Sequence, residues 1–134
     1  MRPEVLVDTS AVLALLDDSD ENADSARAWL QRRGNTHGLV IPDVVVSECS
    51  ALLDRRLNFR ATNNFVNDVL PWIEQHSTDE MRMLQALSAY RAGTGRRRPS
   101  LADCVSFQLK RDQGIHQAFA FDQHFVDAGF TLVA

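Results

Sequence analysis

The sequence predicts an α/β fold: a three-layer α/β/α sandwich in which a mostly parallel central sheet lies between helices. Short apolar runs typical of buried strands alternate with longer segments whose apolar residues repeat at helical spacing. This alternation is typical of βα units, which place helices on both faces of a parallel sheet. A chain of 134 residues suffices for one core, so we expect residues 1–134 to form a single domain.

Five apolar segments are expected to form the strands. They are residues 4–7 (EVLV), 38–41 (GLVI), 72–76 (WIEQH, the weakest), 117–121 (QAFAF) and 130–133 (FTLV). In sheets of this class, ligands bind beyond the carboxyl ends of the strands, where the strand order reverses. Functional residues are therefore expected at that edge.

Helices are expected between these strands. Their ranges are a short helix from Ser10, then 20–33, a helix entered at Pro42, 58–70, 78–90, and 100 to about 112. Proline suits the first turn at Pro42. Thr78 and Ser100 are suitable caps, and Gly114 is suited to end the last helix.

The composition limits the class of protein. Hydrophobic residues make up 45% and charged residues 24%, as is ordinary for a globular chain. No apolar run approaches the ~20 residues of a membrane span, and the N-terminus lacks a signal-peptide pattern. Cys49 and Cys104 show no paired-ligand spacing, so we expect reduced core thiols in a cytoplasmic protein. A net charge of −4 argues against nucleic-acid binding by bulk attraction, but not against a local basic patch.

Two aspartates directly follow expected strands. Asp8 ends the run at residues 4–7, and Asp122 follows the run at residues 117–121. Taken singly, each is explained by a helix cap or a turn. Thr9 and Ser10 could cap equally well, which weakens the need for Asp8 in that role.

Two further acids lie in expected helices. Glu48 occupies a core-type position, because the residues one turn away on either side are apolar: Val44, Val45, Ala51 and Leu52. A carboxylate there needs a cation, either an arginine such as Arg55 or a metal ion. Asp103 lies in the first turn of its helix and points away from the packed face, where interaction with the helix dipole would also explain it.

Together, these four acids predict a metal site made of Asp8, Glu48, Asp103 and Asp122. Two carboxylates ~4 Å apart repel by about 4 kcal/mol at an effective dielectric constant near 20, so such a cluster would not stay ionised unaided. A hard divalent cation resolves the repulsion. Ligands that are all oxygen favour Mg²⁺ or Mn²⁺ over zinc.

The same residues carry a resemblance to a known family. The segments LVDTSA, PDVVVSE, SLADC and FAFDQHF, with the order and spacing of the four acids, resemble the PIN-domain ribonucleases, in particular the VapC-type toxins of type II toxin–antitoxin systems. The resemblance covers essentially the whole chain. It implies a PIN-like sandwich, an RNase site that depends on Mg²⁺ or Mn²⁺, a homodimer, and a cognate antitoxin that blocks the site. One departure is Ala120, where the family often has a threonine.

The predicted function is therefore metal-dependent endonucleolytic hydrolysis of RNA phosphodiester bonds. Asp8, Glu48 and Asp103 would hold a first metal ion, and Asp122 would complete the site. The alternative is a PIN-like module that binds RNA or protein without cutting it. The intact acidic set argues against that alternative, because a pure binder has no need for four repelling carboxylates.

Several other residues have two interpretations. Ser10 could assist a metal-bound water or phosphate, or it could cap its helix. Arg96, Arg97 and Arg98 could bind RNA phosphates or form a solvated loop. The histidines (His37, His76, His116 and His124) form no acid–base motif, and His124 is interpreted as a surface residue. By the family resemblance, an antitoxin helix would lie in a groove along the apolar helices of residues 42–70.

Overall fold

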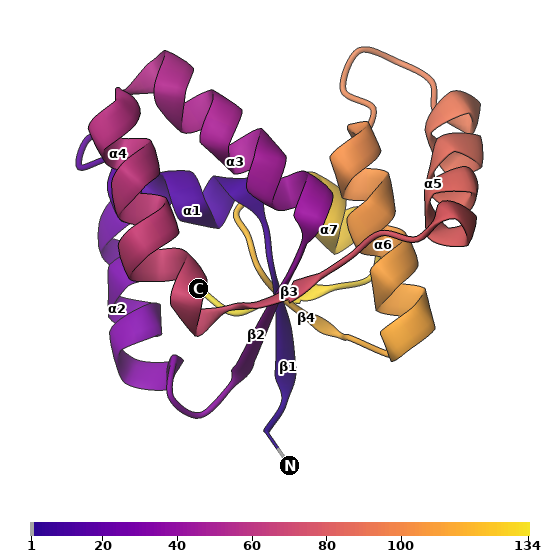
Figure 1. The fold of residues 1–134 in the computed structure, drawn as a ribbon. Helices are drawn as coiled ribbons and strands as arrows, with labels where there is room; N and C mark the ends of the chain where they lie inside the picture. The colour runs from indigo at the N-terminus through magenta and orange to yellow at the C-terminus, as the bar shows by residue number, and fades with distance from the viewer. Residues whose placement is uncertain (1) are drawn as a thin grey trace.

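A computed structural model describes residues 2–134 and contains a five-stranded, fully parallel sheet in the order β3-β2-β1-β4-β5 (Figure 1). The strands are β1 (Glu4–Val7), β2 (Gly38–Pro42), β3 (Glu74–His76), β4 (Gln117–Phe119) and β5 (Thr131–Leu132). The expectation of a mostly parallel sheet is confirmed. Each strand is shorter than or equal to its expected segment, except that β2 gains Pro42.

The strand order reverses beside β1. The chain first builds outward through β2 and β3, and then returns to place β4 on the other side of β1. Val7 pairs with Phe119 at the carboxyl ends of β1 and β4, and the Asp8 N–H donates to the Phe119 carbonyl at 3.1 Å. Asp8 and the residues after β4 therefore leave the sheet side by side, at the edge where ligands bind in such folds.

Helices cover both faces of the sheet, which confirms the three-layer arrangement (Figure 1). They are α1 (Thr9–Leu16), α2 (Ala23–Arg33), α3 (Asp43–Arg56), α4 (Phe59–Asn64), α5 (Glu80–Ala92), α6 (Leu101–Gln113) and α7 (Gln123–Asp127). One core joins sheet residues such as Val7 and Ile41 to α1–α4. The other joins Leu6 and Val40 to Leu109 of α6 and to α7, and α5 packs on the outside of α6.

Three local expectations are wrong. Asp79 rather than Thr78 caps α5, because the Thr78 hydroxyl donates to Asp43 at 2.6 Å. Pro42 is the N-cap of α3 and the last residue of β2, so it lies just before the first turn. The expected helix over 58–70 is α4 followed by a π-helical turn, η1 (Phe65–Val69), and a 3₁₀ turn, η2 (Leu70–Trp72).

Other local expectations are confirmed. Ser100 caps α6, and Gly114 ends it in the left-handed conformation with φ of 66°. Cys49 and Cys104 are both buried and unpaired. Within residues 2–134, no helix combines the length and the apolar character needed to cross a membrane.

Candidate metal centre

Asp8 is held at the start of α1 by Ser10. Its Oδ2 accepts hydrogen bonds from the Ser10 N–H at 3.1 Å and from the Ser10 hydroxyl at 2.6 Å. The same hydroxyl oxygen accepts from the Phe121 N–H at 2.9 Å, so it ties Asp8 to the chain leaving β4. Asp8 is the N-cap and Ser10 is not, which makes the capping interpretation of Ser10 wrong. Asp8 is only 3% exposed.

Asp103 is held at the start of α6 by a capping box. Its Oδ2 accepts from the Ser100 N–H at 3.0 Å, while the Asp103 N–H donates to the Ser100 hydroxyl oxygen at 3.1 Å. The helix-end interpretation of Asp103 is thus correct. Although it lies off the apolar stripe of α6, Asp103 is buried at 8% exposure.

Asp122 caps α7 and lies beside Asp103. Its Oδ1 accepts from the His124 N–H at 2.9 Å, and its side chain is 40% exposed. Asp103, Asp122 and His124 each offer one ligand atom, and these atoms lie within 4.8 Å of one another. The interpretation of His124 as a surface residue is wrong, because α7 turns its ring inward onto the two carboxylates.

Glu48 reaches the site from α3 through Thr9. The Thr9 hydroxyl donates to Glu48 Oε1 at 2.5 Å and accepts a long hydrogen bond from the Cys49 thiol at 3.7 Å. Glu48 is half-buried rather than in the core. The ion pair considered with Arg55 does not form: within residues 2–134, no arginine or lysine pairs with any of the four acids.

The charges of the four acids act on one another, although only Asp103 and Asp122 of the four offer ligand atoms within 4.8 Å of each other. Burial raises the pKa of Asp8 to about 7, and the charge of Asp103 adds to the rise against the hydrogen bonds from Ser10. Burial, and then the charges of Asp122 and Glu48, raise the pKa of Asp103. At the 4.8 Å limit of the Asp103–Asp122 pair, two full charges repel by about 3.5 kcal/mol at a dielectric constant near 20.

The donor set fits a divalent cation. Asp103 and Asp122 each use one carboxylate oxygen for helix capping. The second oxygen of each carboxylate accepts no hydrogen bond from any residue between 2 and 134. His124 Nδ1 is shielded from solvent and makes no hydrogen bond within the same residues. Oxygens of two carboxylates and one nitrogen thus converge, and within residues 2–134 the His124 ring is the one group able to carry positive charge that pairs with them.

The arginine loop (Arg96, Arg97 and Arg98) lies beside this centre and is exposed. Arg98 stacks on Tyr90, with its guanidinium carbon 4.4 Å from the ring centroid and a 3.0 Å hydrogen bond to the phenol oxygen. The carbonyl of Arg97 accepts a hydrogen bond from His124 Nε2. The loop therefore contacts the candidate metal centre through its backbone.

Sequence reasoning missed two residues of the centre, Thr9 and His124. Thr9 was considered only as a cap, although it stands between Asp8 and Ser10 in LVDTSA. His124 lies two residues after Asp122, and this spacing on a short helix is the one signal that could have found it.

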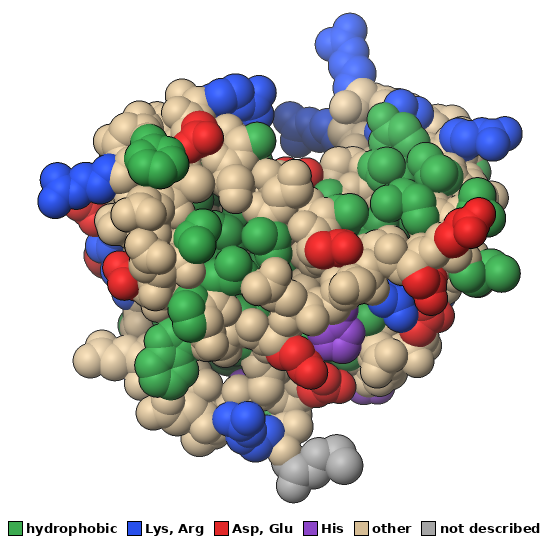
Figure 2. All heavy atoms as spheres, viewed as in Figure 1, with side chains coloured by type: hydrophobic (Ala, Val, Ile, Leu, Met, Phe, Trp, Pro, Cys, Tyr) green, Lys and Arg blue, Asp and Glu red, His purple; other side chains and the backbone are tan. Residues whose placement is uncertain are grey.

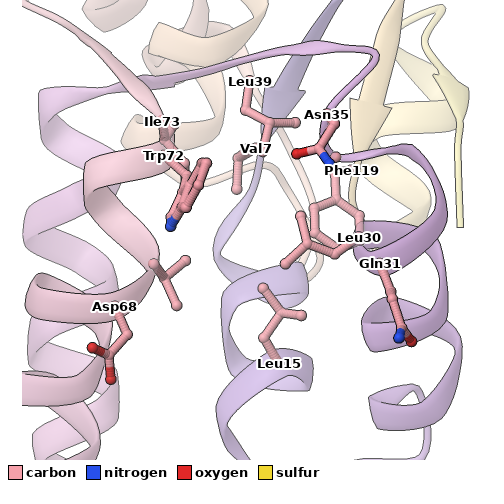
Figure 3. A pocket seen from close by; sticks show the side chains of 12 residues that line it. Val7, Leu15, Leu30, Gln31, Asn35, Leu39, Asp68, Trp72, Ile73 and Phe119 are labelled. Atoms are coloured by element: carbon pink, nitrogen blue, oxygen red, sulfur yellow. The ribbon is translucent and has the colours of Figure 1, made fainter.

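A separate apolar cavity of about 290 Å³ lies on the α1–α2 face of the sheet (Figure 3). Its walls include Leu15 of α1, Leu30 of α2 and Trp72 of η2, and its floor includes Val7 and Phe119. None of the four acids lines it. The cavity is therefore distinct from the candidate metal centre.

The fold and its acidic edge define a parallel α/β protein with a candidate metal-binding site at the strand-order reversal. The PIN domain family model matches residues 5–131, and the chain belongs to this family. Among curated proteins, none matches closely enough to serve as a relative.

Solved structures agree with the family. VapC20 of Mycobacterium tuberculosis, described as a sarcin-ricin loop cleaving toxin, is 27% identical with a TM-score of 0.81 over 95% of this chain and 96% of that one. VapBC2 of Rickettsia felis bound to promoter DNA is 10% identical with a TM-score of 0.68, covering 96% of each chain. FitAcB of Neisseria gonorrhoeae is 16% identical with a TM-score of 0.68, covering 97% of this chain and 96% of that one. The last two likenesses concern the fold alone.

Proposed function

We propose that this chain is a metal-dependent endoribonuclease that hydrolyses RNA phosphodiester bonds as the toxin of a toxin–antitoxin pair. The observation that carries the proposal is that Asp103 and Asp122 place ligand atoms within 4.8 Å of each other and of His124, while the charges of Asp8 and Glu48 act on Asp103. Within residues 2–134, no arginine or lysine pairs with any of these acids. Membership of the PIN-domain family and the likeness to VapC20 support the same reaction class.

Asp8, Glu48 and Asp103 would hold a Mg²⁺ or Mn²⁺ ion, and Asp122 would complete the site. When bound, such an ion supplies an activated water and neutralises charge on the phosphate. The chain's own groups fix the ligands in place: the Ser10 hydroxyl orients Asp8, and the Ser100 capping box orients Asp103. The Thr9 hydroxyl does the same for Glu48. Ser10 thus acts as a positioning residue, because its hydroxyl already donates a hydrogen bond to Asp8 and accepts one from the Phe121 N–H.

The arginine loop is proposed to bind substrate phosphates. Arg96 and Arg97 are exposed, and neither makes an ion pair with any residue from 2 to 134. Their guanidinium groups are free to form bidentate contacts with phosphate oxygens beside the acidic site. Arg98 is partly engaged by Tyr90 and would contribute less.

The proposed protein partner is a cognate antitoxin. Large hydrophobic side chains are exposed along the segment from α4 to η2, where Phe59 is 73% exposed, Val66 44% and Trp72 76%. Figure 2 shows hydrophobic side chains gathered on this part of the surface and over α5. Leu53 and Phe65, from the same stretch of residues 42–70, are fully buried and belong to the core. A homodimer stays a prediction, and light scattering after size exclusion would test it.

The proposal is tested by incubating purified protein with rRNA and with a hairpin carrying the sarcin-ricin loop. We expect cleavage with Mg²⁺ or Mn²⁺ and none in EDTA. Asp8→Asn and Asp103→Asn should each cut at least about 100-fold more slowly, because each replaces a charged carboxylate ligand by a neutral amide. Asp24→Asn, an exposed acid of α2, is the matched control and should cut normally.

Three outcomes would contradict the proposal. Undiminished cleavage in EDTA would exclude the metal mechanism. Equal cleavage by the protein and by Asp8→Asn would point to a contaminating nuclease. Binding of RNA without cleavage under any metal would favour the alternative, a non-catalytic PIN-like module.

A further inference from the structure

We propose that His124 is a metal ligand through Nδ1, so that the centre has a nitrogen donor and prefers a first-row transition-metal dication to Mg²⁺. The inference rests on the metal centre of the proposed function, but not on RNA cleavage.

The position of the imidazole is the first argument. His124 Nδ1 lies 3.3 Å from Asp122 Oδ1 and 3.7 Å from Asp103 Oδ2, and the side chain is 23% exposed. Yet Nδ1 is itself shielded from solvent and forms no hydrogen bond within residues 2–134. A buried polar atom normally has a bonding partner. For His124 Nδ1, that partner would have to lie next to the carboxylates of Asp103 and Asp122.

The other ring nitrogen defines the tautomer. His124 Nε2 contacts the carbonyl of Arg97, and a carbonyl oxygen can only accept, so Nε2 carries the hydrogen. In a neutral ring, the lone pair then lies on Nδ1 and is directed at Asp103 and Asp122. A backbone carbonyl that holds the remote N–H is the usual outer partner of a metal-bound histidine.

The distances favour a shared ion over a shared proton. Charge-assisted N–H···O bonds are about 2.7–2.9 Å long, shorter than either separation. Neighbouring ligands of a six-coordinate ion at about 2.1 Å stand about 3 Å apart. The 3.3 Å between Nδ1 and Asp122 Oδ1, the oxygen that also caps α7, approaches this spacing. The ligand atoms of Asp103, Asp122 and His124 all fall within 4.8 Å of one another.

The nitrogen donor changes which metal the centre prefers. Mg²⁺ favours oxygen ligands, whereas imidazole is a good ligand for first-row transition metals. A set of carboxylates alone gives little reason to prefer Mn²⁺, but replacing one oxygen by Nδ1 of His124 raises the relative affinity for Mn²⁺. The donor set is thus mixed, in contrast to the all-oxygen site expected from the sequence.

The competing role for His124 is that of a positively charged counter-ion, and it predicts the opposite response to mutation. If the ring only neutralises Asp103 and Asp122, its removal frees both carboxylates and tightens metal binding. If the ring is a ligand, its removal weakens Mn²⁺ binding.

The test is Mn²⁺ binding to the full chain without RNA, followed by electron paramagnetic resonance, with Mg²⁺ as competitor. In the unaltered protein, pulsed spectra of bound Mn²⁺ should show coupling to a directly ligated ¹⁴N, and histidine labelled with ¹⁵N should change that coupling. His124→Asn, which keeps an oxygen near the Nδ1 position, should lose the nitrogen coupling and bind Mn²⁺ at least about 10-fold more weakly. Its Mg²⁺ affinity should change less than about threefold. His116→Asn, at an exposed histidine, is the matched control and should leave both affinities unchanged.

The labelling arm needs no variant, so the inference stays testable if His124→Asn fails to fold. Absence of nitrogen coupling, or tighter metal binding by His124→Asn, would overturn the inference. Nitrogen coupling without RNA cleavage would uphold it while refuting the proposed function, and cleavage without nitrogen coupling would do the reverse.

Discussion

Replacing Asp8 by asparagine should make the metal-free protein more stable at neutral pH. Asparagine keeps an oxygen that can accept the Ser10 hydrogen bonds but removes a buried charge. The pKa of Asp8 rises from 3.8 to about 7 in the folded chain, mainly through burial, so the folded state holds a proton that the unfolded state releases between these values. Stability from this group is fully present below pH 3.8 and is lost as the pH rises towards 7. A rise of about three pH units, at about 1.4 kcal/mol each, corresponds to about 4 kcal/mol.

The assay is urea unfolding of both proteins in EDTA, near pH 4 and near pH 8. The free energy of unfolding of Asp8→Asn minus that of the unaltered chain should increase by about 4 kcal/mol between the two pH values. At the higher pH, Mg²⁺ at about 100 times its dissociation constant should restore about 2.7 kcal/mol to the unaltered chain and much less to the variant. A difference that stays the same at both pH values, within about 1 kcal/mol, would refute the assignment of a strained buried carboxylate to Asp8.

Three further predictions use other parts of the structure. Ser100→Ala removes the capping box that holds Asp103, and should lower the free energy of unfolding by about 1 kcal/mol and weaken Mn²⁺ binding in a calorimetric titration. Gly114→Ala places a Cβ at φ of 66°; it should cost about 1–2 kcal/mol in urea unfolding while leaving metal binding unchanged. Changing Arg96, Arg97 and Arg98 together to glutamine should make the slope of log K against log salt shallower by up to about 2 in RNA-binding titrations. The figure assumes about 0.7 for each RNA phosphate that an arginine no longer neutralises. An unchanged slope would exclude the loop from the RNA interface.

The strand ends and the acids at them could be predicted, because a charged residue that interrupts an apolar run is a local signal. Asp8 and Asp122 each follow a buried strand, and the parallel topology then brings the two strand ends together. The caps expected from single residues are compatible with the candidate metal centre. Each cap uses one carboxylate oxygen and leaves another for a cation.

The residues that were misread depend on contacts between distant parts of the chain. α7 is only five residues long, too short for a periodic signal, so nothing local shows that it turns His124 onto Asp103. Thr78 looked like a better cap than its neighbour until Asp43, 35 positions away, engaged its hydroxyl. The π-helical turn η1 has a local cause instead: it precedes Pro71, which cannot donate the hydrogen bond that a regular helix would need.

The central place of β1 has a consequence during protein synthesis. β1, the first of the five strands in chain order, lies at the centre of the sheet, and one of its two neighbours, β4, is the fourth strand to be made. Pairings this distant along the chain form late. A nascent chain interrupted before residue 117 has no β4 and lacks Asp122. The candidate metal centre is therefore incomplete until residues 117–127 have been made.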